Sequence, residues 1–174
     1  MKSIIFKVSR EVVKIIRYLS VIGIIAMILG IFGVLFEAMH QNGKFTLDYG
    51  IQIQQVSVLL PISILFLTAI ILYFVFQLMK NLDKLLINFQ VESYFNAENV
   101  NFLSKTLVYL LLSTGVQIVI NIISNSIGLE NASALFDFSI KNYLLNLMLL
   151  IINYIGILVI KHGAQLQNDY DEII

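Results

Sequence analysis

Four long stretches without a charged residue constrain this chain more than any other feature. They cover residues 18–36, 60–79, 106–127 and 142–160. A helix of about 20 residues is long enough to cross the hydrocarbon core of a bilayer. Strands of a membrane barrel would be shorter and would alternate polar with apolar residues. The stretches therefore predict an all-α integral membrane protein with four transmembrane helices in one domain, residues 1–174.

The composition agrees with this fold class and excludes an ordinary water-soluble domain. Hydrophobic residues make up 59% of the chain and charged residues 13%, and the mean hydropathy is +0.88. A soluble domain is about one-half apolar and one-quarter charged. Eleven basic residues balance eleven acidic ones, so we expect no direct nucleic-acid partner. The absence of cysteine excludes thiolate metal sites and thiol catalysis by these residues.

The distribution of basic residues predicts the orientation in the membrane. Lys44 and Lys141 lie in the first and third connections, which are short and are expected to hold no domain. The other nine lie in the N-terminal segment, the central connection and the tail: Lys2, Lys7, Arg10, Lys14, Arg17, Lys80, Lys84, Lys105 and Lys161. The positive-inside rule places these nine in the cytoplasm. We therefore predict a multi-pass protein of the cell (plasma or inner) membrane with both termini cytoplasmic.

Two boundary features refine this prediction. Pro61 is tolerated in the first turn of a helix, so the second helix is expected to begin near Leu60. The first stretch is longer than the apolar region of a signal peptide and lacks a convincing cleavage site, so it is expected to be retained.

Short connections between the spans predict an antiparallel four-helix bundle, because consecutive helices then lie side by side.

The N-terminal segment has the spacing of an amphipathic helix. Lys7, Arg10, Lys14 and Arg17 follow one another at steps of three and four residues and share one face. Apolar residues such as Ile5, Val8, Val12, Ile15 and Ile16 lie mainly on the other faces. This pattern predicts an interfacial helix in the headgroup plane before the first span, drawn there by anionic lipid. The alternative is a docking surface for an acidic partner.

Within the spans, small and amide residues predict helix packing. Gly23, Ala26, Gly30 and Gly33 form a seam in the first span, which packs either within the bundle or in a homo-oligomer. The last two spans carry amides and one serine: Gln117, Asn121, Ser124 and Asn125, and then Asn142, Asn146 and Asn153. We expect these polar side chains to hydrogen-bond across helices. A polar solute path is the alternative, although no ionisable residue lies inside any span.

Catalytic chemistry finds little support in the sequence. Glu37 and His40 could share a helix face as metal ligands, but one such pair without further His or Cys is weak. No zinc-protease, nucleophile-elbow or phosphate-loop motif is present. We therefore predict a protein that is not an enzyme, with no metal and no cofactor.

The central connection predicts a helix–break–helix unit. Leu82, Leu85, Leu86 and Phe89 continue the second helix beyond its span, and a break follows at residues 92–95. Asn96 can then cap the third helix, with Glu98 in its first turn.

A family resemblance appears at this break and in the tail. Residues 94–103 resemble the segment Pro-Phe-x-x-x-Asn-Val-x-x-Leu of a family of small four-span bacterial membrane proteins of unknown function, with Tyr94 in place of the proline. Gly163, Leu166, Gln167, Asp171 and Ile174 match that family's C-terminal signature. Its members are often encoded beside a small Cro-like helix-turn-helix regulator. The resemblance implies a non-enzymatic membrane component and transfers no catalytic residue.

Together these patterns favour a regulatory or scaffolding membrane protein that docks a cytoplasmic partner, such as a small transcriptional regulator. The candidate partner-binding residues are Phe95, Asn99, Leu103, Leu166, Tyr170 and Asp171. A helical tail could lay Leu166 and Tyr170, four residues apart, into a groove of a partner or of the protein itself. The alternative is a small transporter or channel subunit that is active as an oligomer. A membrane enzyme is the third interpretation.

Overall fold

A computed structural model describes residues 2–40, 44–48, 53–126 and 140–171. Its long helices are α1 (Lys2–His40), α2 (Leu59–Gln90), α3 (Ala97–Ser126) and α4 (Ile140–Asp171). Each of the four is long and apolar enough to cross a membrane. The prediction of a helical protein with four long apolar helices is therefore confirmed.

The helices are longer than the predicted spans. α1 has 39 residues and α3, the shortest, has 30. At 1.5 Å per residue these lengths are about 58 Å and about 45 Å, whereas the hydrocarbon core of a bilayer is about 30 Å thick. Every helix therefore extends well beyond what is needed to cross the bilayer.

The N-terminal basic segment does not form a separate interfacial helix. α1 runs without a break from Lys2 to His40, so the predicted interfacial helix is instead the first part of α1. No glycine or proline precedes Val21 that could turn the chain into the headgroup plane. Two of the arginines also hold this part of α1 against α2, as described below.

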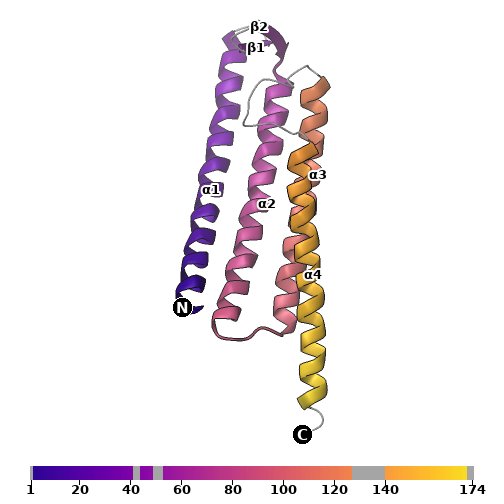
Figure 1. Ribbon diagram of the computed structural model, residues 1–174. Coiled ribbons are helices and arrows are strands. Elements are labelled where there is room, and N and C mark those ends of the chain that lie inside the picture. Colours follow the sequence, from indigo (N-terminus) through magenta and orange to yellow (C-terminus); the bar gives the residue numbers. More distant parts are fainter. Residues whose placement is uncertain (1, 41–43, 49–52, 127–139, 172–174) are drawn as a thin grey trace.

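The four helices form a helical bundle in which only consecutive helices lie in contact. Figure 1 shows α1 leading away from the N-terminal end, α2 returning beside it, and α3 and α4 following at the other side. Among the described residues, α1 contacts α2, α2 contacts α3, and α3 contacts α4. No helix contact joins α1 to α4 within this part of the chain. The bundle is thus open between its first and last helices.

A small β-hairpin connects α1 to α2, and the sequence reading did not include it. β1 (Lys44–Asp48) pairs antiparallel with β2 (Ile53–Ser57), in a register that runs from Lys44 opposite Ser57 to Asp48 opposite Ile53. The fold is therefore not purely helical. Phe45 and Leu47 alternate with polar residues on the first strand, which is the period-two signal of a strand.

The start of α2 matches the expectation from Pro61. The helix begins at Leu59, so Pro61 is its third residue and lies in the first turn, where its missing N–H leaves no intrahelical bond unmade. α2 continues to Gln90, as Leu82, Leu85 and Phe89 predict.

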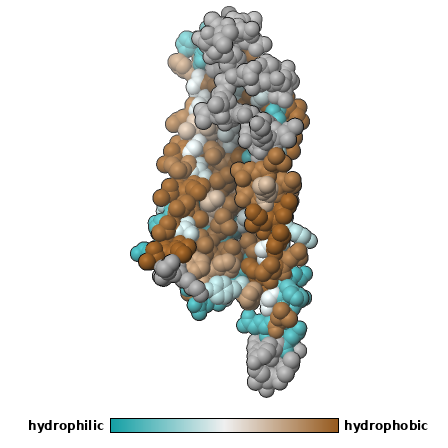
Figure 2. All heavy atoms as spheres, in the orientation of Figure 1, coloured by the Kyte–Doolittle hydropathy of each residue, from teal (hydrophilic) through white to brown (hydrophobic). Residues whose placement is uncertain are grey.

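The surface is unusually apolar for a folded chain. Hydrophobic residues cover the sides of the helices in Figure 2, and hydrophilic residues gather at the lower end near the α2–α3 turn and the end of α4. Large side chains such as Phe32, Leu29 and Ile152 are more than half exposed. Such a surface suits contact with lipid rather than with water.

Candidate functional site

The end of the molecule that carries most of the basic residues is also its most elaborately packed part. We define it as residues 2–17 of α1, 80–96 of α2 and the following turn, 97–105 of α3, and 161–171 of α4, and call it the basic end. At its border Leu85, Leu103 and Ile160 form a buried cluster contributed by three helices. Leu82, Phe89, Val100 and Ile157 pack around this cluster. The basic end therefore continues the helical bundle instead of forming loops.

An acidic residue of α2 holds the basic face of α1. Asp83 accepts a hydrogen bond from Arg10 Nε at 3.2 Å, and Arg17 Nη1 lies 3.9 Å from its other carboxylate oxygen. The Asp83 side chain is only 14% exposed, so these contacts are screened less than ordinary surface pairs. Arg10 also donates to the side-chain oxygen of Gln90 at 3.2 Å. Two of the four predicted membrane-surface cations thus join α1 to α2.

The other two cations of this face remain on the surface. Lys14 contacts Glu11 at 2.8 Å, within α1. Lys7 is exposed. These two lysines are therefore the members of the predicted set that remain placed to meet lipid headgroups.

Asn99 is the polar centre of the basic end. It is fully buried, and its side-chain N–H groups donate to the carbonyl oxygens of Ser93 at 2.7 Å and Tyr94 at 2.9 Å. Its side-chain oxygen accepts a hydrogen bond from Asn88 Nδ2 at 2.8 Å. Asn99 therefore fixes the turn between α2 and α3. The expectation that it contacts a partner is wrong for this arrangement, because no surface of its side chain is accessible.

Both helix ends at this turn are capped, and the sequence predicts the cap of α3. The Asn96 side-chain oxygen accepts a hydrogen bond from the backbone N–H of Asn99 at 2.7 Å, which is an N-cap of α3. At the end of α2 the N–H of Ser93 donates to Asn88 O and that of Glu92 donates to Phe89 O. This pair of bonds is a Schellman motif, with Glu92 in the left-handed position at φ 60°.

α4 approaches the turn through a glycine. A Cβ atom on Gly163 would overlap the ring of Phe95, so the absence of a side chain lets the ring lie directly on the α4 backbone. Phe95 is nevertheless 45% exposed, and it also contacts the ring of Tyr94 edge-on. Phe95 thus packs against α4 and presents part of its ring to the outside.

The remaining candidate partner-binding residues separate into two groups. Leu103 is buried in the cluster with Leu85 and Ile160, so it is a packing residue and the partner-binding expectation is wrong for it too. Leu166 is 58% exposed on α4. The side chains of Tyr170 and Asp171 lie outside the part of the chain that the structure describes.

Amides join α3 to α4 in the predicted spans. Asn146 donates to the side-chain oxygen of Gln117 at 2.8 Å and to the Thr114 hydroxyl at 3.2 Å. Asn121 donates to the Tyr143 hydroxyl at 3.2 Å. The side chains of Asn125 and Asn142 are not among those described.

Two buried oxygen atoms of the same region have no hydrogen-bond partner among the described residues. They are Thr106 Oγ1 on α3 and Asn153 Oδ1 on α4. Asn153 therefore does not form the cross-helix bond through its oxygen that the sequence predicts. An unsatisfied buried oxygen costs about 1–3 kcal/mol, so each of these two atoms destabilises the bundle locally.

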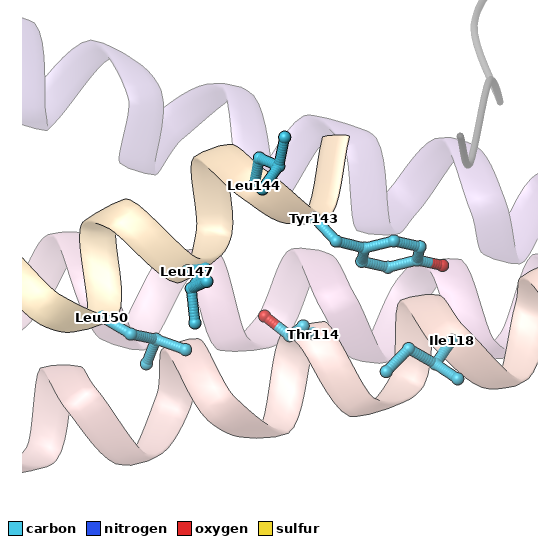
Figure 3. Close-up of a pocket in the computed structure, with 6 residues that line it drawn as sticks. All are labelled: Thr114, Ile118, Tyr143, Leu144, Leu147 and Leu150. Atoms are coloured by element: carbon cyan, nitrogen blue, oxygen red, sulfur yellow. The ribbon is translucent and has the colours of Figure 1, made fainter. Parts of the chain in front are cut away.

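A shallow apolar groove lies beside the amides. It has a volume of about 240 Å³ and is lined by Thr114, Ile118, Tyr143, Leu144, Leu147 and Leu150. Figure 3 shows Leu147 of α4 and Thr114 of α3 pointing toward each other across it. The lining offers hydrocarbon and almost no polar surface, which fits contact with a lipid chain better than catalysis.

The small residues of α1 do not form one seam. A Cβ on Gly23 would lie 2.9 Å from Leu72 of α2, and one on Gly30 would lie 3.4 Å from Leu65. Gly33 has nothing within 4 Å of such a Cβ, and Ala26 is exposed. Gly23 and Gly30 therefore pack against α2, whereas Ala26 and Gly33 face outward.

Among the described residues, no group of three or more His, Cys, Asp or Glu side chains is arranged to hold a metal ion. His40 Nδ1 lies 2.9 Å from the carbonyl oxygen of Phe36, within its own helix.

No protein-family model, curated protein or solved structure matches this chain. Function is therefore inferred from the geometry of the basic end.

Sequence reasoning missed three residues that organise this end: Asp83, Asn88 and Gly163. The sequence assigns no partner to Asp83 or Asn88, and it places Gly163 only in a family signature. A single acidic residue among basic ones on α2 was the available signal for an ion pair with α1. Nothing in the sequence indicates which helix Asn88 contacts, because its partner depends on the packing of α2 against α3.

Proposed function

We propose that this chain is a multi-pass protein of the cell membrane that docks a cytoplasmic protein, without enzymatic activity. The four helices cross the bilayer in antiparallel order, and both termini lie in the cytoplasm. Four apolar helices and the concentration of nine basic residues at one end support this orientation. The bound partner is a protein such as a small transcriptional regulator, as the family resemblance implies, and the protein itself does not contact DNA.

The length of the helices, each greater than the thickness of the hydrocarbon core, is the observation that carries this proposal. α1, α2, α3 and α4 continue into the basic end. There the Asp83 ion pairs join α1 to α2, the Asn99 network joins α2 to α3, and the buried cluster joins α2, α3 and α4. A rigid helical surface positions side chains for recognition more accurately than a loop does. A scaffold function needs such a surface on the side where the partner is found.

The exposed docking residues are Phe95 and Leu166. Phe95 is an aromatic side chain fixed by Gly163 and Tyr94 yet partly accessible, which suits an anchor in a protein interface. Leu166 is exposed on α4, whose C-terminal end projects beyond the α2–α3 turn in Figure 1. The chain around Leu166 becomes acidic with Asp169 and Asp171, which favours a partner with a basic surface.

The test is co-purification from native membranes with the regulator encoded nearest to this chain. Leu166→Glu should abolish recovery of the regulator, because a charge then replaces the apolar contact. Gln165→Glu is the matched control, since Gln165 is also exposed and lies on a different face of α4. The proposal is contradicted if both variants recover the regulator as well as the unmodified protein does.

A small transporter or channel subunit is the second candidate. The buried oxygen atoms of Thr106 and Asn153, which lack partners among the described residues, favour it, because a polar solute could hydrogen-bond to them in a state that opens the helices. The absence of any ionisable residue in the predicted spans speaks against an ion path. Solute flux into proteoliposomes that disappears with Asn153→Leu, while thermostability is kept, would favour this candidate over the scaffold.

A further inference from the structure

Three lysines of α2 and α3 gather on one side of the interface between these helices. Lys84 Nζ of α2 lies 5.3 Å from the centre of the Phe102 ring of α3, which is a cation–π contact between the helices. Lys80 lies one turn before Lys84 on α2 and shares its face. Lys105 lies one turn after Phe102 on α3 in the same way. We call Lys80, Lys84 and Lys105 the lysine cluster.

The antiparallel course of the two helices brings the cluster together. α2 runs toward the α2–α3 turn and α3 runs away from it (Figure 1). Lys80 and Lys105 therefore both lie about one turn farther from this turn than the contact between Lys84 and Phe102 does. The two lysines stand at the same height on neighbouring helices.

α4 leaves this side of the interface uncovered. The buried cluster of Leu85, Leu103 and Ile160 places α4 against α2 and α3 on the other side. Leu85 and Leu103 each come one residue after a partner of the cation–π contact, and one residue turns a helix by about 100°. All three residues of the lysine cluster are exposed.

The positive charge of the cluster is not neutralised within the described part of the chain. Asp83, the only acidic residue of α2, contacts arginines of α1 instead. Glu98 lies one turn before Phe102 on α3, but among the described residues it forms no ion pair with Lys84. Neighbouring like charges without a counter-charge favour the binding of an anion.

The height of the cluster indicates which anion fits. The predicted second span ends at Met79 and the third begins at Thr106, so Lys80 and Lys105 are the first residues beyond both spans. The phosphate groups of a bilayer lie at this level, just outside the hydrocarbon core. A phospholipid would place its phosphate at the lysines and its acyl chains along the apolar sides of α2 and α3, whereas a free anion would meet only the lysines.

We propose that the lysine cluster binds the headgroup of an anionic phospholipid in the cytoplasmic leaflet, one lipid for each chain. Phe102 positions the ammonium group of Lys84, and two helices contribute the cations. The N-terminal lysines Lys7 and Lys14, by contrast, belong to a single helix. The inference rests on the proposed insertion and orientation of the helices, and not on the docking of a regulator.

Lipid titration of the detergent-purified protein, followed by native mass spectrometry, tests the site. The unmodified protein should retain one dioleoyl phosphatidylglycerol at concentrations where dioleoyl phosphatidylcholine dissociates. Lys80→Gln/Lys105→Gln should weaken binding of phosphatidylglycerol about 25-fold, because each cation near an anionic lipid surface contributes about fivefold. Lys7→Gln/Lys161→Gln removes two exposed lysines from other helices and should bind like the unmodified protein. Equal weakening in both double variants, or equal retention of the two lipids, would overturn the proposal.

A second pair of variants leaves every lysine in place. Phe102→Leu removes the cation–π contact and should weaken phosphatidylglycerol binding by about two- to fivefold. Phe102→Trp keeps an aromatic face under Lys84 and should bind like the unmodified protein. Equal affinities of these two variants would overturn a site at the α2–α3 interface.

Two controls separate this inference from its alternatives. Excess inorganic phosphate should not displace the lipid, because it lacks acyl chains; displacement would assign the cluster to a free anion and overturn the lipid site. Release of the chain from membranes by alkaline carbonate would contradict the proposed insertion itself. A protein that stays in the membrane but does not distinguish phosphatidylglycerol from phosphatidylcholine contradicts the lipid site alone.

Discussion

The α1–α2 pair and the α3–α4 pair consist of similar apolar helices but are held together by different side chains. In the first pair Gly23 leaves space for Leu72, so the helices meet by close packing. In the second, Asn146 donates a hydrogen bond to Gln117 across the interface. Lipid chains are as apolar as leucine, so packing and hydrogen bonds replace the hydrophobic effect between helices in a membrane. Within the predicted spans, α1 and α2 therefore meet by close packing at glycine, whereas α3 and α4 are also joined by hydrogen bonds.

Mutation of the α2–α3 turn, which connects the two pairs, should lower the free energy of unfolding the most. Asn99→Ala removes three side-chain hydrogen bonds and takes the donor away from the carbonyl groups of Ser93 and Tyr94. We expect the free energy of unfolding to fall by about 3 kcal/mol. The measurement is thermal or denaturant unfolding in detergent, with the exposed neighbour variant Glu98→Ala as control. Equal stability of the two variants would show that the turn does not organise the bundle.

The close-packed pair should respond next most strongly. Gly23→Leu forces a large side chain against Leu72 and separates α1 from α2, which should cost about 2 kcal/mol. Gly115→Leu is the control, because nothing lies within 4 Å of a Cβ there, and it should change stability by less than about 0.5 kcal/mol. If the two variants unfold at the same temperature, close approach does not hold the first pair together.

The hydrogen-bonded pair should be less sensitive. Asn146→Leu should lower the free energy of unfolding by about 1 kcal/mol, the scale of a cross-helix hydrogen bond in a membrane. In a Gln117→Leu background the same change should cost less, because the two residues share one bond. Solute permeability of proteoliposomes should stay unaltered. If the losses in free energy of unfolding from the two substitutions simply add, the shared hydrogen bond does not explain them. Altered permeability would favour the transporter.

The sequence could predict the features whose cause is local. The four apolar stretches, the position of Pro61 in the first turn and the capping of α3 by Asn96 all follow from neighbouring residues. The alternation in residues 44–48 also signals the β-hairpin, which the prediction of a short connection without a domain did not include. The roles of Asn99 and Leu103 were misread because motif residues were taken to be functional, whereas their burial depends on three helices meeting.

Features that depend on helix rotation could not be read from the sequence. Gly23 and Gly33 are ten residues apart, which places them about 80° apart around a helix. This rotation decides that Gly23 meets α2 and Gly33 faces outward. The ion pair between Arg10 and Asp83 joins residues 73 positions apart. The lone acidic residue of α2 signals an ion pair, but nothing near it identifies Arg10 as the partner.

The smallest predicted effect is a gain in stability at the turn that joins the pairs. Glu92 occupies the left-handed region at φ 60°, where an L-residue is strained by about 1–2 kcal/mol. Glu92→Gly removes this strain but makes the unfolded chain more flexible, so we expect a net gain of about 0.5 kcal/mol. Val91→Gly is the control: its φ is −94°, so glycine relieves nothing there and should lower the melting temperature. A loss of stability in Glu92→Gly would mean that its side chain makes a stabilising contact outweighing the strain.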